Sequence, residues 1–273
     1  MMITFPMAKI NIGLRVTGKR SDGFHDIETF FYPVNLCDAL EFVVAEGKVT
    51  DDELTVTGID IHTHNEKNLV IRAIKKMREK FTVPFLKIHL HKAIPTGAGL
   101  GGGSSDAACI LKSMNRCFNI SLSEDVLRAY ALELGSDCPF FIDPSPSIAT
   151  RRGEELTTVA PILEGYNLVL INPGIHISTR DAYLNSIPAV PKKSLKQLIK
   201  SDPSEWRKHI KNDFEDFAFK LYPQIREIKK SLYLSGAVYA SMSGSGSSVY
   251  GIFDKKPVVA DNLKAFVIYE GVL

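Results

Sequence analysis

Alternating apolar and polar residues mark several short segments of the chain, and this period of two is typical of half-buried strands. In the first segment, residues 8–16, isoleucine, leucine and valine alternate with other residues, so Lys9 and Asn11 share one face. The polar, glycine-containing residues 18–25 suit a hairpin loop. Further extended segments are predicted at 29–32, 40–44, 85–91, 166–172, 237–242 and 248–253.

Helical periodicity separates these strands. Residues 65–81 repeat apolar side chains at helical spacing, with Asn65 as the predicted N-cap. A second helix is expected to begin at Ser104 or Ser105, and a third begins near Ser123 and ends at Gly135 in the left-handed conformation. Residues 194–233 are mostly helical in pattern. The mixture predicts an α+β protein with an N-terminal lobe at 1–155 and a C-terminal lobe at 156–273.

Composition narrows the class of protein. The 33 basic and 31 acidic residues nearly cancel, which argues against a general affinity for nucleic acid or for membrane surfaces. No apolar run approaches the roughly 20 residues that span a bilayer, and the N-terminus lacks a basic stretch followed by an apolar region. We therefore expect a cytoplasmic protein with no membrane partner. A monomer and a weak homodimer are equally compatible with the sequence.

A glycine-rich run between a predicted strand and a predicted helix is the strongest signal of chemistry. It reads P-T-G-A-G-L-G-G-G-S-S-D-A-A from Pro95 to Ala108. Glycines let backbone N–H groups converge on phosphate oxygens, and a helix N-terminus adds about half a positive charge. We expect this loop to bind a polyphosphate through Pro95, Thr96, Gly97, Ala98, Gly99, Leu100, Gly101, Gly102, Gly103, Ser104 and Ser105.

Three common nucleotide-binding classes fit the run poorly. Gly97, Gly99 and Gly102 satisfy G-x-G-x-x-G, but a dinucleotide site also needs an acidic residue after a second strand, and the residues at that distance begin a helix. A P-loop needs a lysine after its last glycine, and Gly103 is followed by Ser104. The H-R-D and D-F-G motifs of protein kinases are missing from the sequence.

The run resembles the signature of the GHMP kinase superfamily, P-x-x-x-G-L-G-S-S-A-A. Its triple glycine before S-S is similar to the branch that phosphorylates 4-diphosphocytidyl-2-C-methyl-D-erythritol. Four further segments agree with that branch in the same order along the chain: A-K-I-N at 8–11, G-K-R-S-D-G-F-H at 18–25, G-S-D-C-P-F at 135–140 and N-D-F-E at 212–215. A late S-G-S-G-S turn at 243–247 also matches, so the resemblance covers essentially the whole chain.

The resemblance implies a fold, a reaction and two cofactors. The fold is a two-lobed GHMP-kinase fold with the active site in the cleft between the lobes. The reaction is transfer of the γ-phosphoryl group of ATP to the 2-hydroxyl of the cytidylated sugar alcohol, in the non-mevalonate isoprenoid (terpenoid) precursor pathway. ATP and Mg²⁺ are the implied cofactors, and Ser104 or Ser105 is the residue expected to touch Mg²⁺.

The resemblance also implies two catalytic residues. Asp137 is expected to accept the hydroxyl proton, and Lys9 to keep Asp137 ionised and to stabilise the nucleophilic oxygen. From the residues alone, the favoured interpretation of Asp137 is a turn residue and that of Lys9 is a solvated lysine on a strand face. Their catalytic roles therefore come from the resemblance.

Cytidine binding is implied for Asn11, Phe24, His25, Phe31, Thr179 and Tyr183. Phe24 stands where the branch usually has Tyr, which keeps the stacking face and loses a hydroxyl. The R-R-G-E turn at 151–154 departs from the usual A-R-G-x-G-E shape, and no role is assigned to it. Two rival hypotheses stay open: a superfamily kinase for homoserine or mevalonate, and a nonenzymatic nucleotide-binding protein on the same fold.

Overall fold

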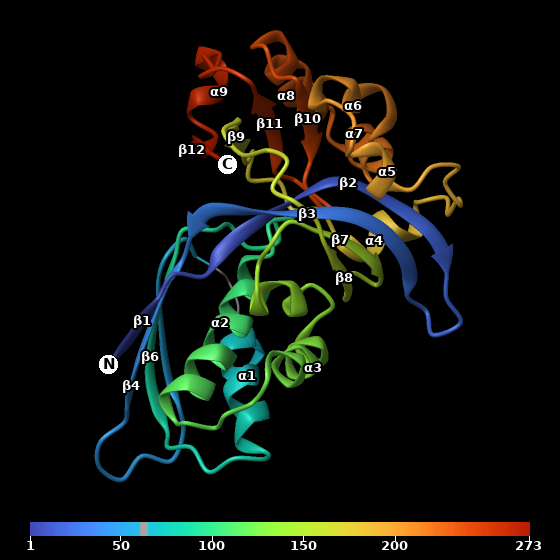
Figure 1. Ribbon diagram of the computed structural model, residues 1–273. Coiled ribbons are helices and arrows are strands. Elements are labelled where there is room, and N and C mark those ends of the chain that lie inside the picture. Colours follow the sequence, from blue (N-terminus) through green and yellow to red (C-terminus); the bar gives the residue numbers. More distant parts are fainter. Residues whose placement is uncertain (61–64) are drawn as a thin grey trace. The chain divides into compact units, whose positions relative to one another are not determined.

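The computed structural model describes residues 1–60 and 65–273, and the chain forms two compact units (Figure 1). Unit 1 contains residues 1–8, 36–96 and 101–144, and unit 2 contains residues 9–35, 97–100 and 145–273. The predicted mixture of helices and sheets is confirmed. The lobe boundary at residue 155 stays a prediction. In the described part of the chain, no helix has the length and apolar character needed to cross a membrane.

Unit 1 is a sheet covered by helices. The strand order is β1-β4-β6-β5, in which β4 and β6 pair antiparallel and β5 and β6 pair parallel. Helices α1, α2 and α3 lie together on one side of this sheet (Figure 1). The elements of unit 1 are β1 (Met2–Thr4), β4 (Ala39–Val44), β5 (Glu53–Gly58), η1 (Asn65–Lys67), α1 (Leu69–Arg78), β6 (Leu86–Lys92), α2 (Gly102–Cys117), α3 (Glu124–Leu134) and η2 (Cys138–Ile142).

Three local predictions in unit 1 are corrected by the structure. Asn65 does not cap α1, because the short 3-10 helix η1 intervenes and the Asn68 side chain accepts the bond from the Val70 N–H at 2.9 Å. Helix α3 does begin after Ser123, but Gly135 ends it with φ 176°, which is extended and not left-handed. From Gly135 and Pro139 the sequence predicts a helix-to-strand turn at Asp137 with Cys138 extended, but Asp137 precedes the 3-10 helix η2, and Cys138 is helical and buried.

Unit 2 contains two sheets. One has the order β2-β3-β7-β8, and the other, β10-β11-β9-β12, is antiparallel throughout. Helix α8 packs on β10 and β11 (Figure 1). The elements are β2 (Met7–Lys19), β3 (His25–Cys37), β7 (Ser147–Arg151), β8 (Glu155–Thr158), β9 (Asn167–Ile171), α4 (Thr179–Leu184), α5 (Leu195–Leu198), α6 (Pro203–His209), α7 (Glu215–Leu221), α8 (Pro223–Leu234), β10 (Tyr239–Met242), β11 (Val249–Phe253), α9 (Asp261–Lys264) and β12 (Val267–Val272).

The long strands β2 and β3 explain how the first candidate residues are held. The alternation in β2 buries Ile10, Ile12 and Val16 completely, and it also buries the opposite face, where Lys9 is only 3% exposed. A strand buried on both faces fixes its polar side chains, because each must find a partner inside the protein. Lys9 and Asn11 are therefore fixed side chains and not mobile surface groups.

Candidate active site

The first part of the glycine loop, residues 97–100, packs against the S-G-S-G-S turn within unit 2. The Ser243 hydroxyl donates to the Gly99 carbonyl at 2.8 Å, and the Ser248 N–H donates to the Ala98 carbonyl at 3.3 Å. Gly99 has φ +79°, and a Cβ built on it would lie 1.9 Å from the Ser243 carbonyl oxygen. Glycine is required here because both the backbone conformation and the close approach exclude any side chain.

The N-D-F-E motif supports that turn. Asn212 is buried, and its side-chain amide donates to the carbonyls of Met242 and Gly244, each at 2.8 Å. Glu215 accepts from the Met242 N–H at 2.9 Å and from Lys229. The motif therefore acts on the loop indirectly. Its side chains hold the S-G-S-G-S turn in place, and that turn holds Gly99.

Lys9 contacts the glycine loop at two points. Its backbone N–H donates to the Leu100 carbonyl at 3.0 Å, and its ammonium donates to the Gly99 carbonyl at 3.2 Å. The ammonium also donates to Asn11 Oδ1 and lies 4.9 Å from the centroid of the Phe31 ring. Buried charge is retained only where such contacts replace water. The amine is thus held in one position beside the loop.

Asn11 and Phe31 surround Lys9 in this structure. Asn11 Nδ2 donates to the Thr29 hydroxyl at 3.0 Å, the Asn11 N–H donates to the Ser243 hydroxyl at 3.1 Å, and its carbonyl accepts from Tyr250 at 2.8 Å. Phe31 is 1% exposed. These contacts position the amine of Lys9, and the expected role of both residues in binding cytidine stays a prediction.

The second part of the loop begins helix α2 in unit 1. The helix starts at Gly102, two residues before the predicted start, after Gly101 in the left-handed conformation at φ 73°. Its first turn contains no acidic residue, so the positive end of the helix dipole is not offset there. Ser105 is 3% exposed, whereas Ser104 is partly exposed and lies in that first turn. Ser104 therefore fits contact with Mg²⁺ better than Ser105.

Asp137 lies near the start of α2 within unit 1. It precedes the 3-10 helix η2 at partial exposure, and the Ser104 side chain hydrogen-bonds the thiol of the next residue, Cys138. Burial raises the pKa of the Cys138 thiol to about 11, and the charge of Asp137 adds to this. The thiol is therefore neutral near pH 7. The pairing of Asp137 with Lys9 stays a prediction.

Sequence reasoning missed a buried ionic cluster at the base of the loop. Lys92, at the end of β6, contacts Asp38 and donates to Asp106 Oδ2 at 2.8 Å, and all three residues are at most 3% exposed. Asp38 also accepts from the N–H groups of Ala93 and Ile94 at 2.7 and 2.8 Å. The cluster ties the strand before the loop to the helix after it.

The protonation of Asp106 gives this cluster a pH dependence. The pKa of Asp106 is raised from its usual value to about 7, first by burial and also by the Asp38 carboxylate, while Lys92 opposes the rise. Since the folded pKa is above the unfolded one, the stabilising contribution is complete below the unfolded pKa and is lost as pH rises through about 7. A neutral Asp106 also leaves one positive and one negative charge, Lys92 and Asp38, in the cluster.

We expect Asp106→Asn to reduce the loss of thermal stability between a pH of about 5.5 and a pH of about 8.5, since the amide stays neutral. The measurement is Tm by calorimetry at both pH values, and the wild type should lose a few degrees more than the variant. Asp125→Asn, an exposed carboxyl on α3 in the same unit, serves as the control. Parallel Tm curves for wild type and Asp106→Asn would contradict the role of Asp106.

Apart from Phe31, which lies beside Lys9, the aromatic residues expected to bind cytidine form a stacked pair and one separate ring within unit 2. His25 stacks on Tyr183 with ring centroids 4.9 Å apart and planes 14° apart, and Tyr183 packs edge-on against Phe214. Thr179, one turn before Tyr183, hydrogen-bonds Ser245 in the S-G-S-G-S turn at 2.8 Å. Phe24 stands apart from this stack, is 51% exposed, and carries the guanidinium of Arg152 over its ring.

Comparison with known proteins identifies the family. Residues 68–143 match the N-terminal domain of the GHMP kinases, and residues 194–269 match their C-terminal domain. A protein of Bacteroides fragilis named 4-diphosphocytidyl-2-C-methyl-D-erythritol kinase is 48% identical over 252 residues, 92% of each chain. A protein of the same name from Cytophaga hutchinsonii is 42% identical over 257 residues, 94% of each chain.

Solved structures agree with these relatives. A crystal structure of 4-(cytidine 5'-diphospho)-2C-methyl-D-erythritol kinase matches with a TM-score of 0.76 and 30% identity, and covers 93% of this chain and 91% of that one. A homoserine kinase of Cytophaga hutchinsonii has a TM-score of 0.66 at 20% identity, covers 92% and 85% of the two chains, and supports the fold alone. The predicted fold, enzyme class and kinase function are confirmed. The chain belongs to the GHMP kinase family and, within it, to the 4-diphosphocytidyl-2-C-methyl-D-erythritol kinases.

Proposed function

We propose that this protein transfers the γ-phosphoryl group of ATP to the 2-hydroxyl of 4-diphosphocytidyl-2-C-methyl-D-erythritol, a step in the isoprenoid precursor pathway. The observation that carries the proposal is the attachment of Lys9 to the glycine loop. Its ammonium is buried and donates to the Gly99 carbonyl at 3.2 Å. A fixed cation beside a phosphate-binding loop suits transfer of a charged group to a neutral alcohol.

The loop and the start of α2 bind the phosphates of ATP in this proposal. Five of the seven residues 97–103 are glycines, which carry no side chain to cover the backbone, and the N–H groups of the first helical turn have no partner within the helix. Ser104, in that first turn, would contact the Mg²⁺ ion that accompanies the nucleotide. When bound, Mg²⁺ would neutralise part of the phosphate charge.

Asp137 and Lys9 have different roles at the acceptor hydroxyl in this proposal. Asp137 accepts the proton of the 2-hydroxyl, and the Lys9 ammonium stabilises the negative charge that develops on its oxygen. The acceptor is a tertiary alcohol. Because its hydroxyl oxygen is crowded, the rate depends strongly on how well that oxygen is aligned with the phosphoryl group. Lys9 suits this alignment because Asn11, Phe31 and the Gly99 carbonyl hold its ammonium in place through three contacts.

The cytosine of the substrate is proposed to stack on Phe24 and to hydrogen-bond His25. A half-exposed ring on a hairpin offers a flat apolar face to a base, which is the usual form of base stacking on proteins. Tyr183 orients the His25 ring by stacking on it at 4.9 Å. Thr179 keeps the helix that carries Tyr183 beside the S-G-S-G-S turn.

ADP release with Mg-ATP tests the proposal when the cytidylated substrate is compared with homoserine, mevalonate and galactose. We expect turnover with the cytidylated substrate alone. Turnover with one of the three other alcohols alone would keep the kinase but reject the proposed substrate. No turnover with any of the four would favour the rival hypothesis of a nonenzymatic nucleotide-binding protein.

A further inference from the structure

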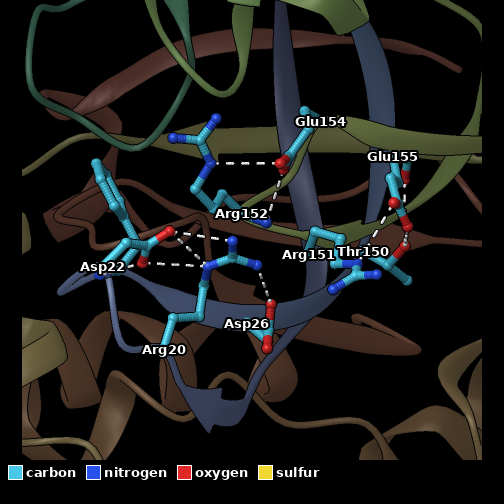
Figure 2. A network of polar contacts seen from close by, with 9 residues as sticks. Arg20, Asp22, Asp26, Thr150, Arg151, Arg152, Glu154 and Glu155 are labelled. Carbon is cyan, nitrogen blue, oxygen red and sulfur yellow. Dashed lines mark hydrogen bonds and ion pairs between the residues drawn. The ribbon is translucent and has the colours of Figure 1, made fainter.

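The hairpin between β2 and β3 holds the backbone of Phe24 rigidly. Arg20 Nε donates to both carboxylate oxygens of Asp22, at 3.2 and 3.0 Å, and Arg20 Nη1 donates to Asp26 at 3.0 Å (Figure 2). Asp22 in turn accepts from the Phe24 N–H at 3.1 Å, and the Phe24 carbonyl accepts from the Arg20 N–H at 2.9 Å. The bond from Arg20, the bond from the Phe24 N–H and the nearby charge of Arg152 hold the pKa of Asp22 below its usual value.

The side chain of Phe24 is held by a second element. The Arg152 guanidinium lies 4.9 Å from the centroid of the Phe24 ring and covers one face of it. Arg152 is itself fixed by Glu154, which accepts from the Arg152 N–H at 2.7 Å and from Arg152 Nε at 3.3 Å (Figure 2). No role was predicted for the turn at 151–154 from the sequence. In the structure, this turn places the Arg152 guanidinium, held by Glu154, over Phe24, which is the only exposed ring among the aromatic residues expected to bind cytidine.

The preceding arginine does not share this arrangement. Arg151 pairs with Glu155 at 3.4 Å, beside Thr150, which also contacts Glu155 at 3.4 Å (Figure 2). Arg151 adopts φ 59°, and this left-handed residue separates the directions of the two successive arginine side chains. The two adjacent residues therefore have the same chemistry and different surroundings, which makes Arg151 a natural control.

We propose that Arg152 is a positioning residue for substrate: held by Glu154, it covers one face of the Phe24 ring and leaves the other face to the cytosine base. This inference rests on the proposed function, in which Phe24 is the stacking platform. A phenylalanine on a hairpin loses rotamer freedom when a ligand stacks on it, and that entropy opposes binding. A cation–π contact that orders the ring beforehand removes part of the cost.

Two other roles of Arg152 fit the contacts less well. A guanidinium that merely occupied the place of the base would have to leave Glu154 whenever substrate binds, and so break the bond from its Nε. A direct contact with the substrate's diphosphate would need local positive charge. The network instead pairs three arginines with four carboxylates, those of Asp22, Asp26, Glu154 and Glu155. If Arg152 supports the Phe24 ring on the face opposite the base, its bonds with Glu154 stay intact and no excess of positive charge is needed.

The test is a double-mutant cycle with Arg152→Gln, Phe24→Leu and the double variant, in which KM for the cytidylated substrate and kcat are measured at saturating ATP. We expect Arg152→Gln to raise KM about three- to five-fold with kcat unchanged, which is the size of a cation–π contact at a half-exposed site. In the Phe24→Leu background the same substitution should add nothing, because the ring on which Arg152 acts is gone. Arg151→Gln should leave both constants at the wild-type values.

Each departure from this pattern has one meaning. If Arg152→Gln raises KM equally in the presence and absence of Phe24, Arg152 acts on substrate directly and the positioning role is wrong. If Phe24→Leu raises KM and Arg152→Gln does not, the stacking role of Phe24 is kept and the positioning role of Arg152 is wrong. If Phe24→Leu leaves KM unchanged while turnover continues, the stacking role of Phe24 falls, and the positioning role falls with it, although the reaction itself stands.

A second measurement examines the contact without catalysis. In protein with labelled phenylalanine, NMR of the free enzyme should show a chemical-shift change at the Phe24 ring on Arg152→Gln and none on Arg151→Gln. Identical Phe24 ring signals in wild type and Arg152→Gln would overturn the proposal whatever the kinetics.

Discussion

Asp137→Asn is expected to lower kcat by about a hundred- to ten-thousand-fold, the range that general bases contribute. The amide has the shape of the carboxylate but cannot accept the proton of the acceptor hydroxyl. ATP binding should be unchanged, because the proposed phosphate site consists of backbone N–H groups of the loop and not of this side chain. Single-turnover kinetics together with calorimetric titration of ATP separate the two quantities.

The chain offers a matched control for that substitution. Asp143 ends the same 3-10 helix that Asp137 begins, and it is exposed. Asp143→Asn makes the same chemical change at the other end of one short element, so it should leave kcat at the wild-type value. An Asp137→Asn enzyme with near-normal kcat would show that this carboxylate is a turn residue and not the base.

Gly99→Ala is expected to have the second largest effect. The added methyl would lie 1.9 Å from the Ser243 carbonyl oxygen, so the loop or the S-G-S-G-S turn must move. Left-handed strain and overpacking together should lower the free energy of unfolding by about 2–5 kcal/mol. Because Lys9 donates to the Gly99 carbonyl, the shift also displaces the amine, and kcat/KM should fall about tenfold or more.

Gly165→Ala separates the two causes of that destabilisation. Gly165 also has positive φ, at +84°, but a Cβ there meets nothing within 4 Å. It should therefore lose only the strain contribution, about 1–2 kcal/mol, and keep full activity. Chemical denaturation measures both variants, and equal losses for Gly99→Ala and Gly165→Ala would mean that the packing against Ser243 is unimportant.

The sequence predicted the parts of the fold whose signal is local. The alternation at 8–16 and 85–91 corresponds to β2 and β6, and the glycine loop lies between β6 and α2 as expected. Short strands at the edges of the sheets, such as β1 and β12, were not predicted, since their partners β4 and β9 lie far away in the sequence. Pairing over such distances leaves little trace in a window of a few residues.

The buried cluster around Lys92 shows a signal that was present and overlooked. Leu86, Ile88 and Leu90 are buried at alternate positions of β6, and one further step of the same period puts Lys92 on the buried face. A lysine there requires a carboxylate partner, because a buried unpaired charge is too costly. Which carboxylates supply it, Asp38 and Asp106, depends on folding of distant segments and could not be predicted.

The residues of the candidate site also divide into those with a local signal in the sequence and those without one. The loop residues and Ser104 follow from the glycine run itself, whereas Asp137 and Lys9 were found only through the family resemblance. Ser243 and Asn212 were missed as contributors, although both belong to motifs that matched the family. The contact of Ser243 with Gly99 joins residues 144 positions apart, and those of Asn212 with Met242 and Gly244 join residues 30 and 32 positions apart, so only the tertiary structure brings these segments together.

The most direct test of the proposed reaction is ³¹P NMR of the product formed from Mg-ATP and 4-diphosphocytidyl-2-C-methyl-D-erythritol. The account predicts one new phosphomonoester signal, attached at the 2-position of the erythritol unit, that grows in step with ADP while the diphosphate signals of the substrate persist. ADP formed without that phosphomonoester, or a phosphate attached at any other hydroxyl, would contradict it.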